Sequence, residues 1–345
     1  MAVLVTGATG FIAQYIINGL LEQGYKVIGT VRNESKKEKI LADYEFNPNL
    51  SLETVPDLCN LNAFDSLISK RSQDIDYVLH TASPVFFDCE DYEKEILLPA
   101  INGMKSILNA VKKFGHEHIK RVVMTTSSAA FTTLGEKDKL IDETSWDPIT
   151  WDEAFKDGVH AYFASKTFAE QGAWKFMKDN ANEINFDLVT MGPFYVFGPQ
   201  LFASTFKEKK LNLSNNVIGQ FLNLAIDPND ETVPQKFPDN GFIDVRDVAK
   251  AHILAIQKDE FAGQRVMLYN QQCNGQDIID ILNDEVDGLK GKLPVGRPGT
   301  GPYFRQDRKI VVNNEKSRKL LGFKLIPLET SVKDMAMQYL NYANK

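Results

Sequence analysis

The 345-residue sequence has few of the residues that mark metal sites, disulfide frameworks or nucleic-acid surfaces. Its three cysteines, Cys59, Cys89 and Cys273, are far apart and form no Cys-x-x-Cys pair, which argues against a disulfide framework and a zinc site. The five histidines have no metal-ligand spacing, so we expect no bound metal, and we interpret His80 as structural. With a formal net charge of −7, the chain lacks the positive charge that nucleic-acid binding requires.

Long apolar runs and targeting signals are also absent. No stretch reaches the length of a membrane-spanning helix, and the N-terminus has no charged leader and no cleavage site. We therefore expect a cytoplasmic protein with reduced cysteines that binds neither membrane nor nucleic acid. Hydrophobic residues make up 43% of the chain, enough for the core of one large or two smaller domains.

Residues 1–13 contain the clearest local pattern. An apolar run at 2–5 precedes a glycine-containing turn at 6–13, and a helical pattern follows at 15–22. Strand, glycine turn and helix in this order open a dinucleotide-binding α/β fold. Gly7 and Gly10 permit a tight turn close to a pyrophosphate, and the helix N-terminus offers it N–H groups and a partial positive charge. A purely structural turn without a ligand is the alternative for this pattern taken alone.

Strand and helix patterns alternate up to about Met191. Strands are predicted at 25–31, 50–55, 76–80 and 121–125, and helices from 33 onward, at 63–71 and at 91–114, with a kink at Pro99. This alternation predicts an α/β fold with a Rossmann-type doubly wound parallel sheet covered by helices on both faces. We assign residues 1–191, together with about 240–260, to this domain.

Beyond Gly192 the alternation ends, and glycine, proline and aromatic residues crowd together at 192–199. Helices are expected near 215–226, 246–258, 275–284 and 329–342. We expect 192–239 and 261–345 to form a smaller, partly interleaved C-terminal substrate-binding domain. Ligands of open parallel sheets bind beyond the carboxyl ends of the strands, so the substrate should lie between that edge and the second domain.

Tyr162 and Lys166 are four residues apart, which places both on one face of a helix. An ammonium close to a phenol favours the phenolate and lowers its pKa, so such a pair makes a proton donor or acceptor. The preceding strand ends in a Thr-Thr-Ser-Ser run, from which Ser127 can bond the same substrate oxygen. Taken alone, the two patterns also fit a surface pair on a helix and a polar turn.

Taken together, these segments resemble the extended short-chain dehydrogenase/reductases and, more narrowly, their dihydroflavonol-reductase-like branch. The resemblance rests on the glycine turn, on Ser127 and on the Tyr162/Lys166 pair. Further matching segments lie at 10–14, 80–84, 195–199, 243–252 and 319–323, so the resemblance covers nearly the whole chain in order.

The resemblance implies an NADPH-dependent carbonyl reductase that transfers hydride to an aldehyde or ketone and gives an alcohol. Methylglyoxal, 3-methylbutanal, diketones and bulkier ketones all suit this chemistry. Tyr162 is then the proton donor, Lys166 holds the nicotinamide ribose and depresses the tyrosine pKa, and Ser127 orients the carbonyl. Asn102 either completes a proton relay or bonds a neighbouring backbone group. The helices at 91–114 and 162–180 imply a homodimer, because they form the dimer interface in many relatives.

The charge at the end of the second strand predicts the choice of cofactor. NAD-binding relatives carry an acid there that binds the ribose 2′-OH, whereas this strand ends in Thr30-Val31-Arg32. Arg32 can pair with a 2′-phosphate and Lys36 is placed to help, so we predict NADPH, and we interpret Lys37 as a solvated helix charge. With the positions that the resemblance adds, the predicted cofactor-binding residues are Gly7, Thr9, Gly10, Phe11, Ile12, Arg32, Lys36, Asp57, Leu58, Thr81, Ala82, Ser83, Tyr162, Lys166 and Pro193.

A substrate pocket is predicted from mostly apolar residues near the same edge. Its members are Val85, Phe86, Ser128, Phe131, Phe163 and Tyr195. For the aromatic members, packing in a domain-interface core is the alternative. Relatives often have an aromatic residue at the position of Ser128 and a phenylalanine at that of Val85, so we expect a roomier pocket that accepts bulkier ketones.

Two other functions fit parts of the pattern. A nucleotide-sugar epimerase or dehydratase shares the fold and usually keeps NAD tightly bound. Arg32 in place of the ribose-binding acid argues against it, as does the lack of an evident diphosphate-binding Arg/Lys cluster in the second domain. A non-catalytic NADP(H) sensor shares the glycine turn, but such proteins usually lose the Tyr-x-x-x-Lys pair that this chain has at Tyr162 and Lys166.

Overall fold

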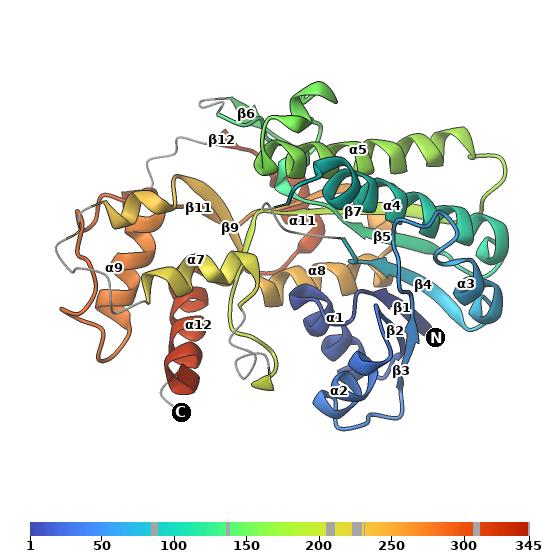
Figure 1. Cartoon of the computed structure of the whole chain (residues 1–345), viewed down its shortest axis with the longest axis horizontal. Helices are drawn as coiled ribbons and strands as arrows, with labels where there is room; N and C mark the ends of the chain where they lie inside the picture. The colour runs from blue at the N-terminus through green and yellow to red at the C-terminus, as the bar shows by residue number, and fades with distance from the viewer. Residues whose placement is uncertain are drawn as a thin grey trace.

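The computed structural model describes residues 1–83, 89–135, 139–204, 211–222, 230, 232–305 and 311–343. Its largest element is a seven-stranded sheet in which every neighbouring pair is parallel (Figure 1). In spatial order the strands are β10 (Arg265–Leu268), β7 (Asp187–Pro193), β5 (Arg121–Thr125), β4 (Ile75–His80), β1 (Ala2–Thr6), β2 (Lys26–Val31) and β3 (Leu50–Thr54). Read from β3, this is the strand order of dinucleotide-binding folds. The predicted Rossmann-type fold is confirmed.

Helices cover both faces of this sheet (Figure 1). Successive side chains of a strand point to opposite faces, and in β1 Val3 and Val5 join one core cluster while Leu4 joins the other. The layer on the Val3 side contains α1 (Phe11–Glu22), α2 (Ser35–Asp43), α8 (Val245–Gln257) and α11 (Glu315–Leu321). The layer on the Leu4 side contains α3 (Asp65–Arg71), α4 (Leu98–Ala110) and α5 (Gly158–Asp179).

The region predicted as one helix at 91–114 has three parts. Helix α4 is flanked by two π-helical turns, η1 (Glu93–Leu97) and η2 (Val111–Gly115). Pro99 is the second residue of α4, and the wider turn η1 directly before it accommodates a residue that has no N–H to donate. Helix α1 begins at Phe11, earlier than the predicted residue 15, because Gly10 already acts as its N-cap.

A second group of elements lies at the other end of the molecule from α3 (Figure 1). It contains a small sheet of β8 (Tyr195–Phe197), β9 (Asn240–Asp244) and β11 (Gln271–Cys273), with α7 (Leu213–Phe221), α9 (Gly275–Glu285), α10 (Pro302–Arg305) and α12 (Leu328–Ala343). Phe197, Phe242 and Leu282 belong to its own buried cluster. Strand β10 falls in the range 261–345 that we had assigned to the second domain, but it is the last strand of the large sheet, paired with β7.

The remaining elements are short. A two-stranded parallel sheet joins β6 (Leu140–Ile141) to β12 (Val311–Val312). Single 3₁₀ turns are η3 (Ser128–Ala130), η4 (Asp152–Phe155), η5 (Val233–Lys236) and η6 (Asp259–Phe261). Over the ranges that the structure describes, no helix combines the length and the apolar character needed to span a membrane.

Candidate active site

The turn between β1 and α1 brings backbone close to backbone at the carboxyl edge of the sheet. Gly7 has a φ of 73°, and a Cβ built there would lie 3.1 Å from the Cα of Ala82. The hydroxyl of Thr6 accepts the N–H groups of Thr81 at 3.1 Å and Ala82 at 3.0 Å. Only glycine combines this conformation with this approach, so the ends of β1 and β4 meet tightly at one point.

The Thr6 hydroxyl also determines the state of His80. Since its oxygen accepts two N–H groups, its hydrogen is left for Nδ1 of His80, 3.0 Å away. Burial and the charge of Lys166 lower the pKa of His80 to about 4, so the ring is neutral and can accept this bond. His80 thus supports the turn, in line with the structural role that we expected.

The N-terminus of α1 has backbone donors available for an anion. Its N-cap, Gly10, offers no side chain, so no side-chain cap occupies the first-turn N–H groups. The N–H of Gly10 itself donates to the carbonyl of Gly7 at 2.8 Å, which closes the turn. Such a helix terminus suits a phosphate or pyrophosphate.

Three predicted catalytic side chains meet at the same edge. The hydroxyl of Tyr162, on the second turn of α5, donates to Oγ of Ser127 at 3.2 Å. Ser127 follows β5 as the N-cap of η3, and its Oγ also accepts the N–H of Ala129 at 3.2 Å. The Lys166 ammonium lies 5.3 Å from the centre of the Tyr162 ring and donates to Oγ of Ser83 at 2.6 Å.

Burial controls the protonation of this group. It raises the pKa of Tyr162 to about 12, although the hydrogen bond with Ser127 acts to lower it. It lowers the pKa of Lys166 to about 8. We expected Lys166 to depress the tyrosine pKa, and the structure has the opposite net direction. The reason is that desolvation of the phenolate outweighs the favourable interactions available to it.

Asn102 is hydrogen-bonded to a backbone group. It lies on α4, and its Nδ2 donates to the backbone carbonyl of Cys59 at 3.1 Å. Of the two roles left open from the sequence, this contact matches the bond to a backbone group. This bond holds the turn that contains Asp57 and Leu58. Within the turn, Oδ1 of Asp57 accepts the N–H of Cys59 at 2.8 Å.

The end of β2 presents positive charge to solvent. Arg32 and Lys36 are both exposed, and neither forms an ion pair within the described part of the chain. Lys37 differs, because its ammonium lies 2.9 Å from a carboxylate oxygen of Glu34. That carboxylate also accepts the hydroxyl of Thr54. Two cations without an ion pair in the described part of the chain therefore lie where the sequence predicts recognition of a 2′-phosphate.

The predicted pocket residues have different environments. Phe131 is only 2% exposed and lies in a core cluster, where its ring stacks on the guanidinium of Arg265. Ser128, Phe163 and Tyr195 are partly exposed near the catalytic side chains, with the ring of Phe163 6.4 Å from that of Tyr162. Val85 and Phe86 lie outside the residues that the structure describes.

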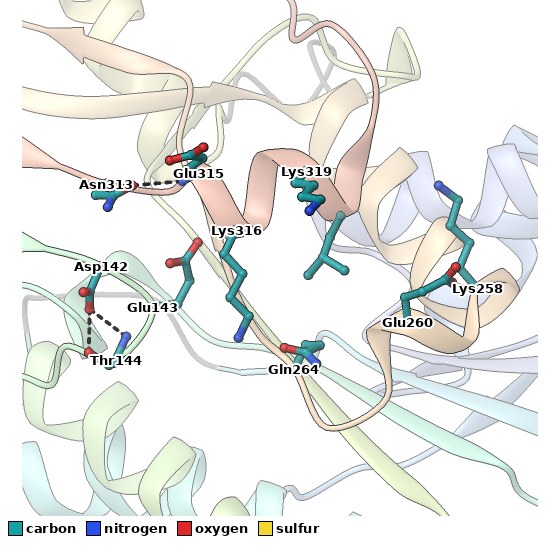
Figure 2. Close-up of a pocket in the computed structure, with 11 residues that line it drawn as sticks. Asp142, Glu143, Thr144, Lys258, Glu260, Gln264, Asn313, Glu315, Lys316 and Lys319 are labelled. Carbon is teal, nitrogen blue, oxygen red and sulfur yellow. Dashed lines mark hydrogen bonds between the residues drawn. The ribbon is translucent and has the colours of Figure 1, made fainter.

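A separate cavity of about 750 Å³ opens between β6, η6 and α11 (Figure 2). Its lining contains both acidic and basic side chains, among them Glu143, Glu260, Lys316 and Lys319. In the view of Figure 2 the Lys316 side chain extends toward Gln264 across the cavity. None of the predicted cofactor, catalytic or pocket residues lines it, so it is no part of the site described above.

Two residues without a predicted role, Glu170 and Arg265, lie beside the catalytic side chains and not at this cavity. Glu170 is on α5, one turn beyond Lys166, and its carboxylate accepts Nε of Arg265 at 2.7 Å. The four-residue spacing from Lys166 to Glu170 was visible in the sequence and placed Glu170 on the catalytic face of the helix. Arg265 had no such signal, because it lies 95 residues from its partner.

Comparison with known proteins gives consistent matches over the full length. The sequence profile of the NAD dependent epimerase/dehydratase family matches residues 3–268. The chain is 44% identical over 348 residues to the NADPH-dependent methylglyoxal reductase GRE2 of Saccharomyces cerevisiae, with 100% of both chains covered. The crystal structure of yeast methylglyoxal/isovaleraldehyde reductase Gre2 complexed with NADPH superposes with a TM-score of 0.95 at 43% identity, covering 100% of this chain and 99% of that one.

A second solved relative agrees. The structure of Gre2 from Candida albicans in complex with NADPH has a TM-score of 0.92 at 41% identity, with 99% of each chain covered. These matches confirm the predicted family and span both parts of the molecule. The chain therefore belongs to the NAD dependent epimerase/dehydratase family, the extended short-chain dehydrogenase/reductases that its sequence resembles.

Proposed function

We propose that this protein is an NADPH-dependent carbonyl reductase that converts aldehydes and ketones to alcohols. The observation that carries the proposal is the hydrogen bond from the Tyr162 hydroxyl to Ser127 Oγ, beside a buried lysine and the glycine turn. The relatives that are 41–44% identical support it, since they include NADPH-dependent methylglyoxal reductase GRE2 and two Gre2 structures in complex with NADPH. Methylglyoxal, 3-methylbutanal, diketones and bulkier ketones are the substrates to consider.

The residues of the cofactor region fit NADPH. Gly7 lets the turn pack tightly against Ala82, which would meet a Cβ at 3.1 Å, and the uncapped start of α1 beside this turn offers N–H donors to a pyrophosphate. Arg32 and Lys36 supply charge for a 2′-phosphate. The complete proposed set adds Thr9, Gly10, Phe11, Ile12, Asp57, Leu58, Thr81, Ala82, Ser83, Tyr162, Lys166 and Pro193.

When bound, NADPH supplies the hydride that the carbonyl carbon accepts. The remaining steps belong to this chain. Ser127 Oγ accepts from Tyr162 and from Ala129, so its own hydrogen is free to donate to the carbonyl oxygen. Tyr162, protonated at neutral pH because its pKa is about 12, would turn its one hydroxyl hydrogen from Ser127 Oγ to the carbonyl oxygen and give it up as negative charge develops there. Lys166 would hold the nicotinamide ribose, and its charge would balance the phenolate that forms.

The wall of the substrate site is proposed to include Ser128, Phe163 and Tyr195, with Val85 and Phe86 from the neighbouring loop. Phe131 supports the wall from behind, since it is buried in a core cluster. A serine at position 128 leaves more room than an aromatic ring, which favours bulkier ketones. The epimerase or dehydratase alternative and the sensor alternative have no observation in their favour at this site.

We also propose the arrangement of the whole molecule. The large sheet with strand β10 and helices α1 to α5, α8 and α11 forms the proposed NADP-binding part. The small sheet, which includes β9 from the range 240–260, forms the proposed substrate-binding part with α7, α9, α10 and α12. The wide spacing of the three cysteines along the sequence supports a reducing, cytoplasmic location. The adjacent helices α4 and α5 are the proposed surface of a homodimer.

Loss of NADPH absorbance with a panel of aldehydes and ketones, with NADH in parallel, tests the function. In Tyr162→Phe we expect kcat to fall roughly 10²- to 10⁴-fold, because the proton donor is lost, with NADPH affinity unchanged. Tyr77→Phe makes the same chemical change on β4, away from the site, and should leave kcat unaltered. Full turnover by Tyr162→Phe, or no turnover of any carbonyl by the parent protein, would contradict the proposal.

A further inference from the structure

A buried ion pair lies directly behind the catalytic group. Glu170 is 0% exposed and Arg265 is 8% exposed, and the guanidinium Nε donates to Glu170 Oε1 at 2.7 Å. Glu170 continues the face of α5 that carries Tyr162 and Lys166, since the three are spaced by four residues. Arg265 begins β10 at the edge of the sheet. The pair therefore joins the catalytic helix to the far strand of the sheet.

The guanidinium of Arg265 has little freedom to move. Each of its five N–H groups has an acceptor: both carboxylate oxygens of Glu170 and the backbone carbonyls of Ala130, Glu143 and Ser145. Its plane lies between the rings of Phe131 and Trp146, with both ring centres 3.6 Å from Cζ. A planar group with all donors used and both faces covered has one well-defined orientation.

The ion pair bonds to the chain on both sides of Ser127. On one side, the hydroxyl of Thr126 donates to Glu170 Oε2 at 3.1 Å. On the other side, Nη2 of Arg265 donates to the carbonyl of Ala130 at 3.0 Å. Ser127 is thus held between two anchors that end at the same pair of charges, and one of those charges is on the helix that carries Tyr162.

We propose that the Glu170–Arg265 pair, acting through Thr126, positions Ser127 opposite Tyr162 and thereby maintains the geometry of proton transfer. Thr126, Glu170 and Arg265 are positioning residues that do not touch the reacting atoms. The inference rests on the proposed function, because Ser127 and Tyr162 are the groups being positioned. Catalysis depends steeply on such geometry: a displacement of about 1 Å lowers rates by about 100-fold.

The chain contains a matched control for this idea. The hydroxyl of Thr190 donates to Glu170 Oε1 at 2.7 Å, so Thr126 and Thr190 make the same kind of buried bond to the same carboxylate. Thr190 lies in β7, paired with Met124 and Arg265, and its neighbour Met191 accepts the N–H of Thr126 at 2.8 Å. The Thr190 hydroxyl, which is the group removed, bonds to Glu170 and not to the segment that contains Ser127. If the carboxylate has a purely structural role, loss of either hydroxyl should change kcat to a similar extent. If it positions Ser127, loss of the Thr126 hydroxyl should lower kcat much more than loss of the Thr190 hydroxyl.

The experiment compares Thr126→Val with Thr190→Val, which each remove one hydroxyl at constant volume. We expect Thr126→Val to lower kcat between about 10- and 100-fold, with the carbonyl KM and the NADPH Kd within about twofold of the parent. Thr190→Val should keep kcat within about twofold of the parent value. It should lower the melting temperature by as much as Thr126→Val does. Thr126→Ser, which restores the donor, should recover most of the lost kcat.

Equal kcat values for the two valine variants, or failure of Thr126→Ser to recover activity, would overturn the positioning role. Crystal structures of both variants add a readout that does not need turnover. We expect the Tyr162–Ser127 hydrogen bond to be broken in Thr126→Val and kept in Thr190→Val, and an intact bond in both would refute the proposal. An inactive parent with this structural difference would instead reject only the carbonyl-reductase function.

Discussion

The side chains of Tyr162 and Lys166 are each shifted toward their neutral form by burial. The phenol is held protonated with a pKa of about 12, and the lysine pKa falls to about 8. For reduction of a carbonyl, the protonated phenol is the useful form, because the oxygen needs a proton as hydride arrives. A high pKa before the reaction is therefore compatible with a proton donor, and the nearby ammonium stabilises the phenolate that results.

The predicted preference for NADPH over NADH depends mainly on one residue, Arg32. In Arg32→Asp we expect the NADPH Kd to rise roughly 100-fold, because a charge-assisted bond to the 2′-phosphate is replaced by repulsion. NADH affinity should change little or improve, since a carboxylate there can accept the ribose 2′-OH. Titration of both cofactors, followed by their fluorescence, measures the two constants.

Lys37→Ala is the control for Arg32→Asp. Lys37 lies in the same segment but is already paired with Glu34 at 2.9 Å, so its removal should alter the NADPH Kd by less than about threefold. An unchanged ratio of NADPH to NADH affinity in Arg32→Asp would show that the 2′-phosphate is recognised elsewhere.

At the scale of elements, the N-termini of α1 and α9 differ in whether side chains cap them. The start of α1 is left uncapped and suits a ligand, whereas α9 is closed by a capping box in which Asn274 and Asp277 bond to each other's backbone. The same Asp277 carboxyl accepts the N–H of Tyr303 at 3.1 Å and so ties α9 to the start of α10. The start of α1 is thus proposed to bind the cofactor, whereas the start of α9 serves tertiary packing.

The Asp277 contact predicts a pH dependence of stability. Burial raises the pKa of Asp277 to about 6. A carboxyl with a higher pKa in the folded than in the unfolded state binds more protons when folded, so its contribution is full below the unfolded pKa of about 4 and is lost as pH rises through about 6. The parent protein should therefore lose on the order of 2 kcal/mol relative to Asp277→Asn between pH 4 and pH 7.

Urea unfolding at several pH values measures this difference. Asp284→Asn changes an exposed carboxyl on the same helix and should follow the parent curve. Parallel curves for the parent and Asp277→Asn over the whole range would rule out the proposed linkage.

At the scale of the whole molecule, α4 and α5 lie side by side on one face of the large sheet (Figure 1). We expect the parent to have twice the mass of the chain in light scattering after size exclusion. Gln171 is exposed on α5, and Gln171→Trp should weaken the dimer by placing a bulky ring in a close helix contact. Gln23→Trp makes the same exchange at the exposed end of α1 and should leave the mass unchanged. A monomeric parent would remove the dimer proposal.

The features that the sequence by itself determined are those that depend on near neighbours. The glycine turn, the alternation of strands and helices and the four-residue spacing of Tyr162 and Lys166 all concern residues a few positions apart, and the structure has each of them. They suffice for the Rossmann-type fold and for the family. The boundary of the second domain was harder to predict from the sequence, because strand β10 joins the large sheet only through its pairing with β7.

Tertiary structure alone decided which side chains are buried and what they meet. Phe131 looked like a pocket residue but stacks on Arg265, and Glu170 finds its partner 95 residues away. The proton preference of Tyr162 follows from the same source, because desolvation depends on every element packed around a group. Local spacing can place a phenol and an ammonium on one helix face, but only the assembled fold determines how much water remains there.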